Sequence, residues 1–181
     1  IAAGVLPGAT ITADKPVQVQ LMTGDIGDRY AFDGFTLFPT ARWSDSYYTP
    51  VSQTCDQASA GGENSHVWIH NANTSPITVN WQDGTGSGTL SVAVGATEVF
   101  TTSQYSGSHF WTTDGSPFGA IGTMDSDLGA SDSNSAWDWG YTLVPETSLS
   151  TAVIVGWGPG QDPTIVPFTE MVYLPFEDEY R

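Results

Sequence analysis

Positively charged side chains are almost missing from this chain. Only 4 Lys and Arg stand against 20 Asp and Glu, which gives a formal net charge of −16. So few basic residues cannot follow a phosphate backbone, and an anionic membrane surface repels the chain for the same electrostatic reason. The composition therefore argues against nucleic acid and acidic membranes as partners. It is typical of a protein on an extracellular surface or in a salty, calcium-containing medium.

Cysteine is nearly absent as well. Cys55 is the only one in the sequence, so an internal disulfide is impossible. If the protein is secreted, its stability must come from its core or from bound metal. Cys55 lies in the polar stretch SQTCDQASAGGENS, where we expect a loop thiol; an intermolecular bridge is the alternative.

Long apolar runs are also lacking. No run approaches the roughly 18 residues that a membrane-spanning helix needs, so we expect no membrane span. The chain starts at Ile1 rather than at Met. We therefore expect either that a signal peptide has been removed or that the chain is a piece of a longer protein.

Helical periodicity is missing too, because no long stretch keeps apolar residues at i, i+3, i+4 and i+7. Alternation and β-branched residues recur instead. They predict strands at residues 9–12, 16–22, 30–38, 47–51, 66–71, 76–81, 88–94, 97–102 and 110–111, after Pro117, and before Pro145. One helical turn is expected after Pro39, and the glycines of DGTG at residues 83–86 predict a hairpin. The expected fold is an all-β, antiparallel β-sandwich.

What the sequence does contain is a pattern that occurs twice. TADKP at residues 12–16 echoes TDGSP at 113–117, and FTLFP at 35–39 echoes YTLVP at 141–145. The spacing indicates a duplicated unit of roughly a hundred residues, much longer than a solenoid repeat. Several strands precede this pattern in the second unit, whereas almost none do in the first. The first unit therefore lacks its opening strands.

The repeat leads to a prediction of three parts. They are a partial first β unit at residues 1–57, a complete second β unit at 58–160, and an apolar C-terminal arm at 161–181. A sandwich without its opening strands exposes edges and half a core. Three hypotheses remain open: the chain is a fragment, its two units share one merged sandwich, or a strand from another copy fills the gap. The arm is the expected donor, through Val166, Phe168, Met171, Tyr173 and Leu174.

An acidic loop in the second unit carries candidate metal ligands. Its oxygen donors are Asp125, Asp127, Asp132 and Asn134. Calcium takes roughly six to eight such ligands from a flexible loop, although this spacing is not that of an EF-hand. The alternative is a solvated loop whose Asp and Ser side chains cap turns. In the first unit, Asp25 and Asp28 occupy the equivalent place.

The aromatic residues and histidines are the remaining candidates. Trp137 and Trp139 lie beside the acidic loop and form the alternative ligand-binding site, a platform for carbohydrate. His66 and His70 share one strand face but lie about 13 Å apart, too far to share a metal. His109 stands alone in the sequence. No nucleophile elbow or zinc-protease motif is present, so we predict no enzymatic activity; the many carboxylates leave a glycosidase as a weaker hypothesis.

A family resemblance lies in several of these segments. They are ITADKPVQVQLMTGDIGDRY, FTLFPTARWSDSYYTPV, SPITVNW, DGSPFGAIGTMDSD, WDWGYTLVPETSL and VGWGPG. Together they cover most of residues 5–160 and resemble bacterial surface proteins related to the N-terminal domain of IgG Fc-binding proteins. The resemblance implies a large secreted or cell-surface protein with repeated β modules. It transfers no functional residue and does not imply immunoglobulin binding.

Composition, repeat and resemblance together favour one function. We expect a non-enzymatic extracellular structural or adhesive protein, such as a filament or surface-layer subunit that self-associates by strand exchange or pairs with the rest of a longer surface protein. The alternative is a calcium-assisted module that binds carbohydrate or another surface ligand.

Overall fold

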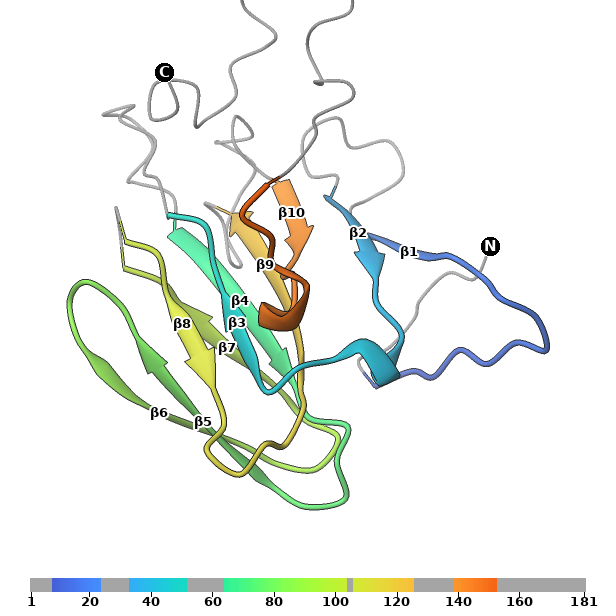
Figure 1. Ribbon diagram of the computed structural model, residues 1–181, viewed down its shortest axis with the longest axis horizontal. Helices are drawn as coiled ribbons and strands as arrows, with labels where there is room; N and C mark the ends of the chain where they lie inside the picture. The colour runs from blue at the N-terminus through green and yellow to red at the C-terminus, as the bar shows by residue number, and fades with distance from the viewer. Residues whose placement is uncertain (1–7, 24–32, 52–63, 104–105, 126–138, 153–181) are drawn as a thin grey trace, which may run out of the picture. The chain divides into compact units, whose positions relative to one another are not determined.

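A computed structural model of the chain describes residues 8–23, 33–51, 64–103, 106–125 and 139–152 (Figure 1). The chain divides into two compact units, Ile1–Leu149 and Ser150–Arg181. The strands and helices described here belong to the first unit. Every strand pair in it is antiparallel, and two four-stranded sheets enclose one core. The prediction of an all-β, antiparallel sandwich is therefore confirmed.

The described elements are ten strands and two short 3-10 helices. In chain order they are β1 (Val19–Thr23), β2 (Asp33–Leu37), η1 (Thr40–Arg42), β3 (Ser46–Tyr48), β4 (Asn64–His70), β5 (Ile77–Gln82), β6 (Ser87–Val92), β7 (Thr97–Thr101), β8 (His109–Trp111), β9 (Gly119–Asp125), β10 (Trp139–Thr142) and η2 (Glu146–Ser148). One predicted strand is wrong, because residues 9–12 are exposed and form no strand. Their β-branched side chains favour extension, but no described strand pairs with them.

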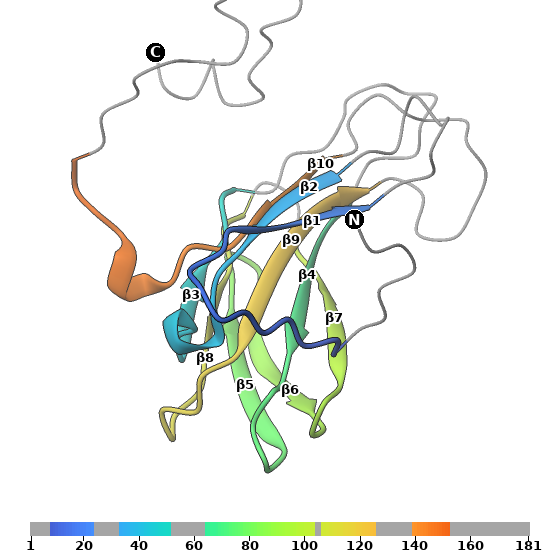
Figure 2. The same ribbon diagram turned by 90° about the vertical axis from the view of Figure 1, so that its right-hand side faces the viewer.

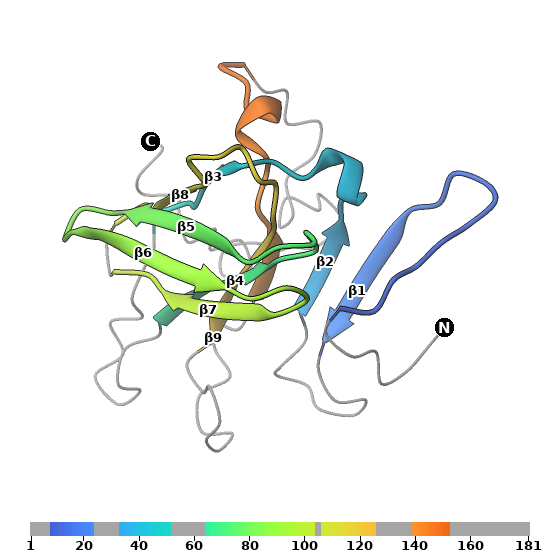
Figure 3. The ribbon, with the colours of Figure 1, turned by 90° about the horizontal axis from the view of Figure 1, so that it is seen from below.

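Two sheets form the sandwich, in the orders β10-β9-β4-β7 and β3-β8-β5-β6. Alternate residues of each sheet face the common core, such as Val67 and Ile69 of β4 and Val79 of β5, all fully buried. Phe100 of β7 meets Phe110 of β8 edge to face across the core, with ring centroids 5.1 Å apart. Figure 3 shows the β5–β6 hairpin beside β7, where the two sheets approach each other.

A buried phenol connects the two sheets. Tyr47 of β3 donates its hydroxyl proton to the carbonyl of Phe118 at 2.8 Å and accepts the backbone N–H of Ser44 at 2.9 Å. Burial raises the pKa of Tyr47, so the phenol keeps the proton that it donates. Because β3 comes from the predicted first unit and pairs with β8 of the second, residues of both predicted units build one core.

The β1–β2 hairpin is a separate two-stranded sheet. Leu21 of β1 lies opposite Phe35 of β2, and the echoing positions Gly122 and Tyr141 lie opposite each other in β9–β10. The register of the two hairpins is thus the same at the echoing positions. β2 lies alongside β10, where Thr142 Oγ1 donates to the carbonyl of Thr36 at 2.6 Å (Figures 1 and 2).

A proline followed by a short 3-10 helix comes after both hairpins. Pro39 and Pro145 precede η1 and η2 with φ of −55° and −53°. Proline suits this position because its ring fixes φ and it has no N–H to leave unpaired at a helix start. The carbonyl of each proline accepts a turn-closing bond at 2.8 Å, from Arg42 N in one copy and from Ser148 N in the other.

Candidate functional site

Most of the residues predicted for metal binding or assembly lie outside the described residues. They are Asp127, Asp132, Asn134, Val166, Phe168, Met171, Tyr173 and Leu174. The ligand-binding candidate Trp137 and the residues Cys55, Asp25 and Asp28 also lie outside the described residues. The backbones of Asp125 and Trp139 are described, at the end of β9 and the start of β10, which pair through Met124 and Trp139. In the described ranges, no three His, Cys, Asp or Glu side chains form a metal-binding group. The calcium site stays a prediction.

The histidines of β4 pair across the ladder with threonines of β7. His66 Nδ1 lies 3.1 Å from Thr101 Oγ1, and His70 Nδ1 lies 2.9 Å from Thr97 Oγ1. Partial burial lowers the pKa of His70, so its imidazole is neutral near neutral pH. These contacts are what ordinary sheet histidines make.

One edge of β1 has no partner among the described strands, whereas the corresponding edge of β9 is covered. β9 pairs on one side with β10 and on the other with β4. β1 pairs with β2 on the corresponding side, and no described strand pairs with its other edge. In β9, Ala120 occupies the position that corresponds to Val19, and Ile69 of the antiparallel strand β4 lies opposite it. By analogy, a strand added to β1 would run antiparallel to it and place an apolar residue opposite Val19.

Apolar side chains near this open edge remain exposed. Val17 echoes Phe118; its side chain is 60% exposed, whereas Phe118 is fully buried. Met22 is 59% exposed, and Val19 and Leu21 are only half-buried. Burying an aliphatic side chain completely is worth about 1.5–3 kcal/mol. In the described part of the chain, this edge therefore offers both backbone groups without a strand partner and apolar surface to another strand.

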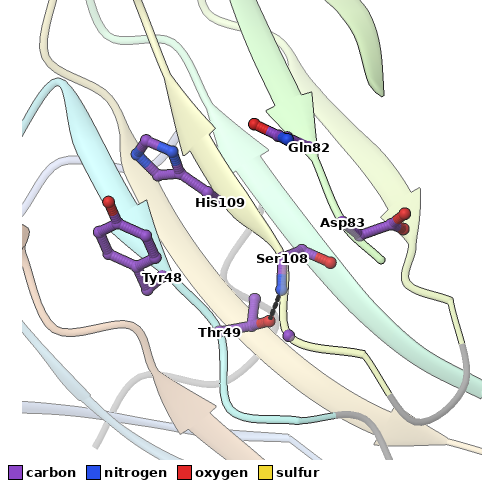
Figure 4. A pocket seen from close by; sticks show the side chains of 7 residues that line it. Tyr48, Thr49, Gln82, Asp83, Ser108 and His109 are labelled. Atoms are coloured by element: carbon purple, nitrogen blue, oxygen red, sulfur yellow. Dashed lines mark hydrogen bonds between the residues drawn. The ribbon is translucent and has the colours of Figure 1, made fainter. Parts of the chain in front are cut away.

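A pocket of about 500 Å³ lies at one end of the other sheet (Figure 4). Three neighbouring strands meet there: the end of β3, the start of β8 and the end of β5. The lining residues are Tyr48, Thr49, Gln82, Asp83, Gly107, Ser108 and His109. Sequence reasoning missed this site because its residues come from three segments that are far apart in the chain.

His109, which stands alone in the sequence, is at the centre of an aromatic stack. Its ring lies 4.1 Å from that of Tyr48 at an interplanar angle of 5°, and 4.5 Å from that of Trp111 at 19°. Partial burial lowers the pKa of His109 although the carboxylate of Glu146 acts in the opposite direction. The imidazole in the stack is therefore neutral near neutral pH. The sequence signals these outward-facing rings only through the runs Tyr47–Tyr48 and His109–Phe110–Trp111, because successive residues of a strand face opposite sides.

His109 also contacts a serine, which raises the question of nucleophilic catalysis. Its Nε2 atom lies 2.8 Å from Ser46 Oγ, the separation expected of a nucleophile and its base. Ser46 is only 8% exposed, however, and it does not line the pocket. We therefore assign this hydrogen bond to holding the imidazole in place.

The wall formed by Asp83 is held by the β5–β6 turn. Asp83 Oδ1 accepts bonds from Thr85 N, Thr85 Oγ1 and Gly86 N at 2.8–3.0 Å, and Oδ2 accepts one from Ser103 Oγ at 2.7 Å. Partial burial opposes ionisation, but these bonds outweigh it and lower the pKa of Asp83 to about 2. The carboxylate is ionised, and its acceptor sites are largely used inside the protein.

The described helical segments are too short to cross a membrane. Comparisons with protein-family models, with curated proteins and with solved structures gave no match. The family resemblance in the sequence therefore stays a prediction. The β1 edge and the pocket between β3, β8 and β5 are the surfaces that bear on function.

Proposed function

We propose that this chain is a non-enzymatic extracellular structural or adhesive protein whose copies join by adding a β-strand to the open edge of β1. The observation that supports this most is the shared register of the two hairpins. In one of them β4 covers the outer edge, and in the other no described strand lies on that edge. The extracellular setting rests on the acidic, lysine-poor composition.

The proposed donor is the C-terminal arm, residues 161–181, of another copy. Its apolar residues Val166 and Phe168 alternate, as does the pair Met171 and Tyr173, and Leu174 follows. Alternate side chains of an added strand face one side, where they cover apolar surface, while its backbone completes the ladder. Strand addition of this kind joins subunits head to tail and, if it does not close into a ring, produces filaments.

Sedimentation velocity of the intact chain at physiological salt tests this proposal. Salt is needed because copies with a net charge of −16 repel each other at low ionic strength. We expect concentration-dependent assemblies for the natural sequence. Val19→Lys, which places a charge on the apolar side of the edge, should shift the population to monomer.

Two control variants add the same charge as the test variants at neighbouring positions where assembly should not be affected. Gln20→Lys lies on the opposite face of β1 and should leave assembly unchanged. In the arm, Phe168→Asp should abolish assembly, whereas Thr169→Asp on the other side of the strand should not. A stable monomer at all concentrations for the natural sequence would overturn the proposal.

A further inference from the structure

We propose that the pocket between β3, β8 and β5 binds a neutral sugar residue of a glycan. This site lies on a different sheet from β1, so the inference does not depend on assembly through the β1 edge. It also differs from the site that the sequence predicted at Trp137 and Trp139. The chemistry of its walls leads to this class of ligand.

The outward face of this sheet is arranged in cross-strand rows. Tyr48 lies opposite His109, and His109 lies opposite Gln82. Figure 4 shows the rings of Tyr48 and His109 face to face, with Gln82 on the next strand. A pyranose has an apolar C–H face and a rim of hydroxyls. The ring of Tyr48 offers apolar surface at one end of this row, and Gln82 at the other end offers an amide that both donates and accepts. Tyr48 is 44% exposed, so its ring is accessible to a ligand.

A buried hydroxyl in the wall has no hydrogen-bond partner in the described part of the chain. Ser108 lines the pocket and is only 2% exposed, yet among the described residues its Oγ makes no hydrogen bond. Leaving a buried polar group unpaired is costly, and a ligand hydroxyl that supplies the missing bond regains that energy. The neighbouring backbone is rigid, because Thr49 N donates to the carbonyl of Ser108 at 2.9 Å and Ser108 N donates to Thr49 Oγ1 at 2.8 Å.

Charge argues against anionic ligands, and the hydrogen bonds of Asp83 argue against cationic ones. Anionic sugars, sulfates and phosphates are repelled by a chain with a net charge of −16. An ammonium ligand would seek Asp83, but four hydrogen bonds from Thr85, Gly86 and Ser103 already satisfy that carboxylate. The imidazole of His109 is neutral. A neutral, hydroxyl-rich ligand fits what remains.

The pocket is prepared before any ligand arrives. His109 is held by Ser46 and enclosed by the rings of Tyr48 and Trp111. The adjacent β5–β6 turn is attached to the chain before β8 through Ser106 Oγ, which accepts Gly84 N at 2.7 Å. Such pre-organisation reduces the entropy that binding costs, which matters for a small, weakly bound sugar.

Nitrogen–proton correlation spectra of the full chain test the inference. The probes are a panel of neutral gluco-, galacto- and manno-oligosaccharides, with sialylated and sulfated oligosaccharides and choline as charged comparators. We expect at least one neutral member to shift the amide signals of Ser108 and His109 saturably. Absence of any shift with all neutral members would overturn the inference, as would binding of only the charged comparators.

Single substitutions separate recognition from folding. Ser108→Ala removes a hydroxyl that makes no hydrogen bond among the described residues, so we expect a melting temperature that is equal or higher and roughly three- to tenfold weaker binding. Tyr48→Ala should weaken binding by about tenfold or more. Ser91→Ala, on the exposed face of β6 outside the pocket, is the matched control and should bind normally. Equal affinity of Ser108→Ala and the natural sequence would place the ligand elsewhere.

Discussion

At the scale of single residues, side-chain hydrogen bonds fix the ends of several described strands. Asp83 shows this at the β5–β6 hairpin, where its carboxylate accepts from two backbone N–H groups and two hydroxyls. Asn71, fully buried, has the same role after β4: its amide donates to the carbonyls of Ser75 and Val92. With so few basic residues, the acidic and amide side chains bind their own turns.

The turn at Asp83 should make stability depend on pH. Its pKa is about 2 in the folded chain, below the ordinary 3.8, so its contribution is complete above 3.8 and is lost as the pH falls towards 2. Asp83→Asn should therefore be less stable than the natural sequence near neutral pH. Urea unfolding of both proteins at several pH values should show the difference shrinking below the ordinary pKa. A difference that does not change with pH would contradict the charge-assisted role.

A second residue-scale prediction concerns the phenol between the sheets. Tyr47→Phe leaves the N–H of Ser44 and the carbonyl of Phe118 without their partner in a buried place. We expect a loss of about 1–3 kcal/mol in the free energy of unfolding, measured in urea. Tyr48→Phe is the control, because the adjacent ring faces outward, and it should change stability by less than about 0.5 kcal/mol.

At the scale of elements, the two hairpins share a register but differ in packing. In β9–β10, Gly122 lets the ring of Tyr141 lie directly on the backbone of the neighbouring strand. Burial raises the pKa of Tyr141 to about 12. In β1–β2, Leu21 takes the place of this glycine, so the residue opposite Phe35 carries a side chain. The β9–β10 hairpin therefore lets an aromatic ring lie closer to its backbone than the β1–β2 hairpin does at the echoing position.

This close approach can be tested with a pair of glycine substitutions. In Gly122→Ala the new methyl carbon would lie within 2.3–2.6 Å of atoms of the Tyr141 side chain, so that ring has to move. We expect a loss of about 1–3 kcal/mol in the free energy of unfolding. Gly34→Ala in β2 is the control, since nothing lies within 4 Å of its added carbon. Equal stability of the two variants would show that the Tyr141 ring moves freely.

At the scale of the whole molecule, a net charge of −16 opposes both compaction and contact between copies. Divalent cations are a natural way to relieve it. The predicted calcium ligands of the acidic loop, among them Asp127, remain the residues to test for this role. A metal that binds only the folded chain raises its melting temperature by mass action.

Calcium should therefore raise the melting temperature, and chelator should reverse the effect. Asp127→Asn should reduce the response to calcium, whereas Asp14→Asn, an exposed residue before β1, should not. Differential scanning calorimetry in calcium, in magnesium and in chelator provides the measurement. Melting curves that coincide in all three would remove the calcium prediction.

The sequence alone determined the strands and their repetition. Alternating side chains decide which residues face a core, glycines and Asp83 decide where a hairpin turns, and prolines decide where strands end. These are local effects, so they appear in the order of residues. The prediction failed at residues 9–12, where a β-favouring segment is described without a partner strand.

Only the tertiary structure decided which strands are neighbours. Ser46 and His109 are separated by 63 residues in the chain, yet β3 and β8 pair and bring them to 2.8 Å. Alternation states the face of a strand but not which strand lies beside it, because that choice depends on packing across the whole core. For this reason the pocket and the aromatic stack around His109 appeared only in the fold. The edge of β1 needed both kinds of information. The sequence showed that this segment repeats a later one, and the sheets showed that no described strand pairs with its outer edge.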